Sequence, residues 1–411
     1  MSNKSEKPER DPRESGDDGG SVYVGLSGGV DSSVSCALLK EQGYDVTGVF
    51  IKIWHPELSN CDWKAEMRDA MRVCAHLDIE FKMIDLSDEY YKDVIGYLIE
   101  EYKIGRTPNP DVMCNKIIKF GHFYDWAMSE GADFVATGHY AQILRDPEIN
   151  SGSQSPSRLP ELGSGSPSDT NNETPAKART TVCGAGTTVF LERGVDHNKD
   201  QTYFLWNIKK EALSNTIFPI GKFEKSEVRK LAEKYNLPNS DKKDSQGLCF
   251  IGDVDLKAFL KKHLNTKRGN VLNEEGRVVG EHDGAELYTF GERHGFKINN
   301  KIDNQKANYI IKKDLEKNTI TISDSENFEK EEIKIKELEL SKINLLVDEF
   351  ESKDLEVLVR YRGKLLKAEV NIKDKKIIFE EKQSVVANGQ SVVFYDQEKC
   401  LGGGVVDSFI K

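Results

Sequence analysis

A polar turn between an apolar strand and an amphipathic helix constrains this chain more than any other feature. The turn reads Ser27-Gly28-Gly29-Val30-Asp31-Ser32-Ser33, follows the apolar run 22–26, and precedes a helical pattern that ends before Gly43. Glycines let the backbone approach a ligand closely, and N–H groups at a helix N-terminus attract anions. No lysine follows the glycines at Walker A spacing. We therefore expect an oxyanion site that suits pyrophosphate.

Strand-like and helix-like segments alternate from this turn to about residue 218. Segments 45–51, 81–85 and 133–138 are typical of strands, whereas 66–77 and 90–102 show helical periodicity. This alternation predicts an α/β fold, a doubly wound parallel sheet that binds ligands at the carboxyl ends of its strands. The Ser27 turn and the Gly138 turn should then share one edge of the sheet.

Changes in composition divide the 411 residues into four segments. Residues 1–20 predict a disordered tail, and 21–218 the α/β domain, interrupted by a flexible polar insertion at 150–180. Residues 219–286 predict a small central connecting domain. Short alternating apolar runs in 287–411 predict a C-terminal antiparallel β-barrel.

Bulk composition narrows the class of protein. No apolar run approaches the ~20 residues of a membrane span, and the first twenty residues lack the apolar core of a signal peptide. Seven cysteines occur without any CxxC pair, which argues against a structural zinc site. The net charge of −11 argues mildly against nucleic acid, although a local basic face is compatible with it. We expect a cytoplasmic protein without membrane contact.

The Ser27 string resembles the signature of the PP-loop ATP pyrophosphatases. This resemblance implies that ATP is cleaved between its α and β phosphates and that a substrate oxygen is adenylated. A carboxylate at Asp31 would hold Mg²⁺ at the triphosphate, although helix capping is an alternative role.

Two cysteines lie in polar surroundings that suit a reactive thiol. Cys114 follows the stiff loop 107–111 and precedes a helical run with Lys116, and Cys249 follows Lys242 and Lys243. Positive charge and a helix N-terminus favour the thiolate. Either cysteine alone could be a small core residue. Together, beside an ATP-cleaving loop, they suggest that one carries a transferable sulfur and the other resolves the product as a disulfide.

Several motifs in order make the resemblance closer. The chain is similar to the bacterial type of tRNA-specific 2-thiouridylases from residue 22 to about 407, apart from the insertion. The motifs are 25–33, 105–111, 114–116, 136–140, 198–205, 243–252, 360–362 and 400–404. The main departures are Leu26 and Ile51, where the family often has Met, and Gln246, where it often has Thr.

The resemblance implies specific roles for residues of this chain. ATP would be bound by Gly25, Leu26, Ser27, Gly28, Gly29, Val30, Asp31, Ser32, Ile51 and Gly138. The target base would be contacted by Asn109, Pro110 and Asp111, with Cys114 as nucleophile and Cys249 as persulfide carrier. Contacts to tRNA would come from His139, Lys199, Asp200, Gln201, Arg360, Tyr361 and Gln390. The implied partners are the anticodon stem-loop of tRNA and a persulfide donor protein, and the chain would be a monomer.

The expected reaction is ATP-dependent 2-thiolation of the wobble uridine of tRNA. Three alternatives remain open at this point. The first is a PP-loop enzyme that amidates a carboxylate, against which the lack of a glutaminase pattern with an N-terminal cysteine in this sequence argues. The second is a PP-loop enzyme that modifies another tRNA base. A tRNA-binding protein with a degenerate loop is the non-enzymatic alternative, against which the intact Asp31, Ser32 and both cysteines argue.

Overall fold

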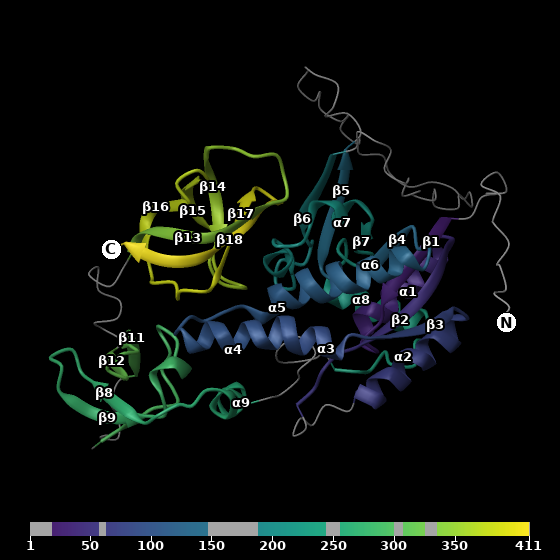
Figure 1. The fold of residues 1–411 in the computed structure, drawn as a ribbon. Coiled ribbons are helices and arrows are strands. Elements are labelled where there is room, and N and C mark those ends of the chain that lie inside the picture. The colour runs from purple at the N-terminus through teal and green to yellow at the C-terminus, as the bar shows by residue number, and fades with distance from the viewer. Residues whose placement is uncertain are drawn as a thin grey trace, which may run out of the picture.

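The computed structural model describes residues 19–56, 63–146, 188–243, 255–299, 307–324 and 335–410. Three sheets organise this part of the chain: a parallel sheet at the N-terminal end, a small mixed sheet, and a closed barrel (Figure 1). The predicted tail 1–20 lies almost wholly outside the described residues, as does the insertion 150–180.

The first sheet is parallel and has the order β3-β2-β1-β4-β7. Its strands are β1 (Gly19–Gly25), β2 (Tyr44–Lys52), β3 (Glu80–Asp85), β4 (Phe134–Thr137) and β7 (Thr216–Ile217). Val22 and Val24 pack against α1 (Val30–Glu41) and α2 (Trp63–Leu77) on one face. Tyr23 packs on the other face with the helices that carry Val94 and Ile118. Both faces are therefore covered, and the predicted doubly wound sheet is confirmed.

Two long helices on that second face contain π-helical segments. The first comprises α3 (Ser87–Glu89), η1 (Tyr90–Ile95) and α4 (Gly96–Lys103). The second comprises α5 (Pro110–Met113), η2 (Cys114–His122) and α6 (Phe123–Ser129). Wide helical turns of this kind are rare and often occur at functional sites. In the second helix the wide segment begins at Cys114.

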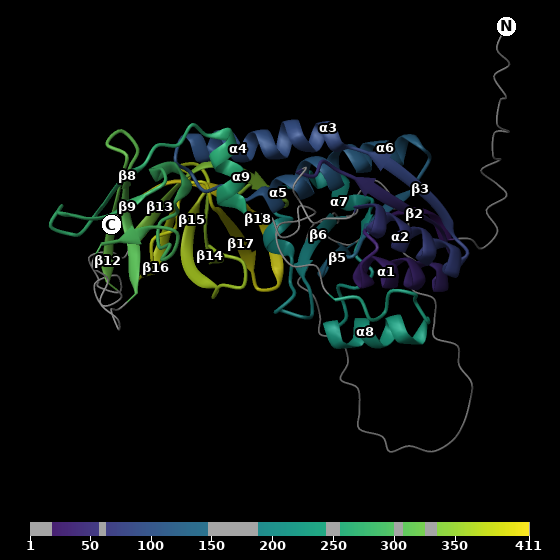
Figure 2. The same cartoon turned by 90° about the horizontal axis from the view of Figure 1, so that it is seen from below.

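Helix α8 (Lys225–Lys234) extends the α/β domain beyond residue 218. Val228 and Ala232 pack against Val30, Val34 and Leu38 of α1. Figure 2 shows α8 alongside α1 on the outside of the domain. The short elements α7 (Lys210–Ser214) and η3 (Thr202–Phe204) complete this part of the chain.

The middle sheet has the order β10-β9-β8-β12-β11. Its strands are β8 (Gly269–Leu272), β9 (Val278–His282), β10 (Lys297–Ile298), β11 (Asn308–Asp314) and β12 (Thr319–Asp324). The helices of this middle domain are α9 (Leu256–His263) and η4 (Ala285–Leu287). Leu98 and Tyr102 of α4 are part of its core, so α4 links the α/β domain to this sheet (Figure 1). The predicted domain limit at residue 287 falls inside the sheet, because β8 pairs with β12 far along the chain.

Six antiparallel strands form the C-terminal barrel, which closes through β13 and β18 and confirms the predicted architecture. They are β13 (Ile335–Leu345), β14 (Ser352–Leu358), β15 (Leu366–Asn371), β16 (Lys376–Gln383), β17 (Ser391–Asp396) and β18 (Lys399–Ile410). The hairpin β5 (Ala141–Asp146) and β6 (Thr188–Arg193) flanks the insertion and pairs with β18. The barrel and the α/β domain thus share one hydrogen-bonded sheet.

Apolar packing reinforces this junction. Trp206 and Tyr203 of the α/β domain are buried with Leu358 and Val393 of the barrel. A Cβ atom at Gly403 would lie 2.8 Å from the Trp206 ring, so only glycine fits there without a shift. No helix among the described residues is long and apolar enough to cross a membrane.

Candidate active site

The Ser27–Ser33 loop forms a tight turn between β1 and α1. Gly28 has a φ of +73°, and a Cβ atom there would lie 2.5 Å from the Glu66 carbonyl oxygen. The Ser27 and Ser32 hydroxyls are 3.3 Å apart, and Ser33 Oγ donates to the Gly29 carbonyl at 2.8 Å. Small residues are therefore required by the local geometry, which leaves backbone N–H groups and hydroxyls around one turn. The donor set suits the phosphates of ATP.

Gly138 brings a second turn against this loop. A Cβ atom at Gly138 would lie 2.7 Å from the Ser32 backbone nitrogen and 2.9 Å from the Asp31 carbonyl carbon. The carboxyl ends of β1 and β4 therefore meet as predicted. Ile51, at the end of β2, is buried with its Cδ1 atom 3.6 Å from where a Cβ of Gly25 would stand. Leu26, which directly precedes the loop, is also buried and packs in the core of the sheet.

Asp31 accepts two bonds that the sequence did not predict. Its Oδ1 atom receives the Lys225 ammonium at 2.7 Å and the Tyr140 hydroxyl at 2.9 Å. Mg²⁺ in nucleotide sites usually takes one or two carboxylates together with substrate phosphates. Asp31 has the carboxylate chemistry of such a ligand, although its Oδ1 atom is bound by Lys225 and Tyr140 in this structure. Lys225 places a cation beside the same loop.

Asn239 and Lys242 form hydrogen bonds with the Ser27–Ser33 loop. Asn239 Nδ2 donates to the Gly28 carbonyl at 3.0 Å and to Ser33 Oγ at 2.9 Å. Lys242 Nζ donates to the Gly28 carbonyl at 3.2 Å and pairs with Asp69 at 2.9 Å. Cys249 itself lies outside the described residues. Asn239 and Lys242, which precede Cys249 in the sequence, are nevertheless both bound to the Ser27–Ser33 loop.

Sequence patterns gave no signal for Lys225 or Asn239. Both lie about 200 positions from the loop that they contact, and neither belongs to a local motif. Tyr140 lies in the turn that the sequence predicts at Gly138, but no local pattern indicates the bond from its hydroxyl to Asp31.

The Asn109–Asp111 segment initiates the helix that carries Cys114. The Asn109 side chain accepts the Val112 N–H at 3.3 Å, and Pro110 occupies the first helical position. Cys114 is 1% exposed and packs with Ile118 and Val94. Cys114 thus lies near a helix start as expected, but it is buried among apolar side chains and not in the polar surroundings that the sequence predicts for it.

The sequence predicts that the charge of Lys116 favours the thiolate of Cys114, but the Lys116 ammonium is bound elsewhere. Its ammonium donates to Asn207 Oδ1 at 3.0 Å, and burial lowers its pKa, with Lys342 and Lys209 contributing in the same direction. The neighbouring Asn115 donates to the Phe204 carbonyl at 3.1 Å. These contacts fix the helix against the 204–209 segment.

His139, predicted to line the tRNA site, is 6% exposed. Its Nδ1 atom lies 2.7 Å from Thr137 Oγ1, and its Nε2 atom lies 3.4 Å from Lys119 Nζ. Burial, with the Lys119 charge as a second cause, holds the pKa of His139 well below its usual value, which disfavours the charged form of the ring. The structure therefore gives His139 internal partners rather than an RNA-facing position.

The predicted tRNA contacts at 199–201 and 360–361 are brought together from two domains. The Tyr361 ring lies 4.5 Å from that of Phe204, and Arg362 donates to the Asn198 carbonyl. Arg360 is exposed on the barrel. Asp200 is instead buried and binds Arg193 at 3.0 Å, and Gln201 accepts the Tyr140 N–H at 2.9 Å. The RNA contacts of Lys199, Arg360 and Tyr361 stay predictions, whereas the side chains of Asp200 and Gln201 form bonds within the protein.

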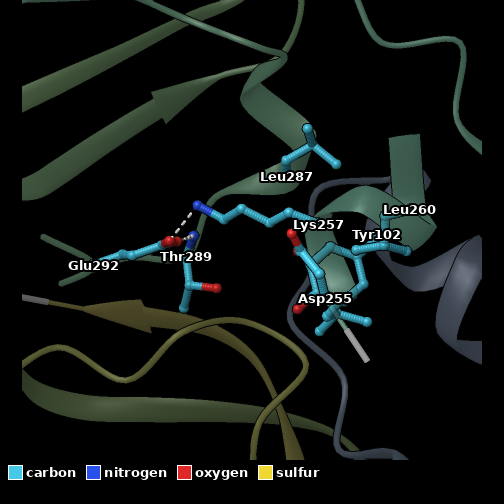
Figure 3. A pocket seen from close by; sticks show the side chains of 8 residues that line it. Tyr102, Asp255, Lys257, Leu260, Leu287, Thr289 and Glu292 are labelled. Carbon is cyan, nitrogen blue, oxygen red and sulfur yellow. Dashed lines mark hydrogen bonds and ion pairs between the residues drawn. The ribbon is translucent and has the colours of Figure 1, made fainter. Parts of the chain in front are cut away.

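A separate cavity of about 360 Å³ lies between α4, α9 and the segment 287–292 (Figure 3). Lys257 pairs with Glu292 across it, and Glu292 also accepts the Thr289 N–H. The lining residues are Tyr102, Asp255, Leu256, Lys257, Leu260, Leu287, Thr289 and Glu292. None of the predicted site residues lines it.

Comparison with known families agrees with this architecture. Residues 20–159 and 174–253 match the tRNA methyl transferase HUP domain, 257–324 the tRNA methyl transferase PRC-barrel domain, and 335–406 the aminomethyltransferase beta-barrel domain. The tRNA-specific 2-thiouridylase MnmA of Streptococcus thermophilus (strain ATCC BAA-491 / LMD-9) is 40% identical over 397 residues, which cover 95% of this chain and 96% of that protein.

The chain belongs to the tRNA-specific 2-thiouridylase family. The MnmA protein of Enterococcus faecalis (strain ATCC 700802 / V583) is 39% identical over 394 residues, 94% of this chain and 95% of its own length. The family assignment drawn from the sequence motifs is thereby confirmed.

Two solved structures are similar to this chain at low sequence identity. The U34-tRNA thiolase NcsA from Methanococcus maripaludis, with its [4Fe-4S] cluster, has 17% identity and a TM-score of 0.33, covering 60% of this chain and 66% of its own. A 4-thiouridine synthetase–RNA complex with bound ATP has 14% identity and a TM-score of 0.31, covering 60% of this chain and 51% of its own.

Replacing Lys225 by Met is expected to weaken ATP use. If the Ser27–Ser33 loop binds the phosphates of ATP as expected, the loss of a cation beside it should lower kcat/KM for ATP about ten- to hundredfold. Pyrophosphate release at varied ATP concentration measures this. Lys234→Met is the matched control, since Lys234 lies on the same helix and pairs with Glu41 at the surface. Equal kcat/KM values for both variants and the wild type would contradict a role for Lys225.

Proposed function

We propose that this protein is the sulfurtransferase that converts the wobble uridine of tRNA to 2-thiouridine at the expense of ATP. Family membership supports tRNA thiolation, and the ATP-using loop is intact. The observation that carries the proposal is the bonding of Asn239 and Lys242 to the Ser27–Ser33 loop. It supports the proposal because these residues directly precede, in the sequence, the segment of Cys249, the proposed persulfide carrier.

The first proposed step is adenylation of the uridine. The 2-oxo oxygen attacks the α-phosphorus of ATP, AMP becomes attached to that oxygen, and pyrophosphate leaves. N–H groups and hydroxyls of the Ser27–Ser33 loop receive the pyrophosphate charge, together with Lys225. Asp111 is the proposed general base near the uridine. Bound Mg²⁺ would neutralise phosphate charge, with Asp31 as its ligand.

The second proposed step exchanges oxygen for sulfur. The terminal sulfur of a Cys249 persulfide attacks C2 of the adenylated base, and AMP leaves with the former uridine oxygen. The Cys114 thiolate then attacks Cys249 Sγ, which releases the 2-thiouridine sulfur and forms a Cys114–Cys249 disulfide. Alternatively, Cys114 attacks the persulfide first, and the released hydrosulfide attacks C2. In both routes a thiol reductant reopens the disulfide, as expected for a catalytic disulfide in the cytoplasm.

Binding of tRNA is proposed across the junction of the barrel and the α/β domain. Lys199, Arg360 and Tyr361 would contact the anticodon stem-loop, and a persulfide donor protein would supply Cys249. The chain is proposed to act as a monomer.

The proposed RNA surface predicts a salt-dependent affinity. Arg360→Ala should lower the slope of log K against log salt concentration by about 0.7 to 0.9, one phosphate contact. Filter binding or fluorescence anisotropy with tRNA between low and physiological salt measures the slope. Lys373→Ala is the control, since Lys373 pairs with Glu351 elsewhere on the barrel. A wild-type affinity that is nearly independent of salt would contradict the proposed surface.

The reaction itself is tested by incubating tRNA with the protein, Mg-ATP and a sulfide source, followed by mass analysis of the nucleosides. The proposal predicts a wobble uridine in which sulfur replaces one oxygen, with one AMP released per product. A modified base at another position, or ATP cleavage without any thiolated nucleoside, would contradict it.

A further inference from the structure

We infer that Gln390 is a positioning residue: its side-chain amide holds Thr107, and through Thr107 the Asn109–Asp111 loop, in the conformation that receives the target base. This inference rests on the function proposed for that loop. It gives the barrel a part in the reaction besides binding RNA.

Both peptide groups of Thr107 are bound by one turn of the barrel. The Thr107 N–H donates to the Asn388 carbonyl at 2.7 Å, and Gln390 Nε2 donates to the Thr107 carbonyl at 2.8 Å. Between them Gly389 has a φ of +91°, and a Cβ atom there would lie 3.0 Å from both Thr107 N and Thr107 O. The turn and Thr107 are therefore in direct contact.

The barrel turn is itself fixed. Gly389 N–H donates to the Val406 carbonyl at 2.8 Å, and Val406 N–H donates to the Gln390 carbonyl at 2.9 Å. Strand β18, which carries Val406, closes the barrel. The Gln390 amide thus acts from a rigid support.

The middle domain holds Thr107 from another side. Thr107 Oγ1 lies 3.0 Å from Thr289 Oγ1, and the Thr289 N–H donates to Glu292, which pairs with Lys257 (Figure 3). The preceding residue, Arg106, binds Asp407 and the Val406 carbonyl on the barrel. It also lies 3.0 Å from Glu101 of α4. Residues 106 and 107 are therefore the point where all three domains meet.

The position of Thr107 is transmitted to the proposed base-binding residues because the loop is stiff. Pro108 and Pro110 have fixed φ angles, and Asn109 caps the helix whose first turn carries Asp111. Cys114 begins the next helical segment. Misplacement of reacting groups by about 1 Å can lower a rate about a hundredfold. Loss of the Gln390 amide should therefore act on the chemical step.

The test replaces Gln390 by Leu, which keeps the size but removes the donor, and by Glu, which keeps the shape and presents only acceptors. At saturating tRNA and ATP, kcat for AMP release should fall about ten- to hundredfold in both variants. If the amide acts through Thr107 alone, the dissociation constant for tRNA should stay within about twofold of the wild-type value. Thermal unfolding verifies that each variant is folded. Gln383→Leu is the matched control, since that barrel glutamine donates only to the nearby Glu381 carbonyl among the described contacts.

The opposite pattern overturns the inference. If the variants bind tRNA more weakly but keep the wild-type kcat at saturating tRNA, Gln390 is an RNA contact. If both kcat and the dissociation constant keep their wild-type values, Gln390 does not position the loop. These results leave the proposed function intact, since the wild-type enzyme would still thiolate tRNA. A wild-type protein that thiolates no tRNA would instead overturn the proposed function, and the inference with it.

Discussion

Replacing Cys249 by Ser is expected to stop sulfur transfer while ATP is still cleaved. A hydroxyl cannot carry a persulfide, so formation of 2-thiouridine from a persulfide donor should fall by roughly a thousandfold or more. Pyrophosphate release should continue, because the Ser27–Ser33 loop is unchanged. Product nucleosides and pyrophosphate are measured in the same reaction. Cys114→Ser is expected to show the same separation, since it removes the thiolate that attacks the persulfide.

Cys74→Ala is the control for loss of a thiol. Burial raises the pKa of Cys74 to about 11, and its sulfur packs against β2 near Gly48. Its replacement should leave the rate of thiolation near the wild-type value. If both the Cys114 and Cys249 variants retain thiolation with a persulfide donor, the cysteine roles proposed above are wrong.

Replacing Gly138 by Ala is expected to disable the ATP site. The added methyl carbon would lie 2.7 Å from the Ser32 backbone nitrogen, so the start of α1 must move. Displacing the N–H groups that receive pyrophosphate should lower its rate of release about a hundredfold. The free energy of unfolding should fall by about 1–3 kcal/mol, as for other overpacked sites.

Gly96→Ala tests whether the effect comes from the contact rather than from the loss of a glycine. A Cβ atom at Gly96 meets only the Tyr91 carbonyl, at 3.7 Å, among atoms within 4 Å. Alanine there should leave pyrophosphate release unchanged and stabilise helix α4 slightly. Wild-type rates of pyrophosphate release in Gly138→Ala would show that the two turns do not form one site.

The parts of the fold that local patterns predicted are those built from neighbouring residues. The alternation of strands and helices predicted the parallel sheet, and the polar turn after β1 predicted the loop that meets Gly138. The limit between the middle domain and the barrel was not predictable, because β8 pairs with β12 about fifty positions later. Strand periodicity gives no information on which strand is the partner.

In the candidate site, too, local patterns predicted single residues but not the contacts between distant segments. The family motifs name Asp31, but only the fold shows that Lys225 and Tyr140 converge on its carboxylate. Motifs also named His139 and Gln390 without indicating where their polar atoms point. Burial of His139 and the bond from Gln390 to Thr107 depend on packing between segments far apart in the sequence. Such contacts leave no local signature.

In the proposed reaction the uridine oxygen is adenylated and then replaced by sulfur. Isotope labelling tests this when tRNA whose wobble uridine carries ¹⁸O at position 2 is supplied together with unlabelled ATP and a persulfide donor. The released AMP should carry the ¹⁸O, because the base oxygen leaves attached to the α-phosphorus. Thiolated tRNA accompanied by unlabelled AMP would contradict it.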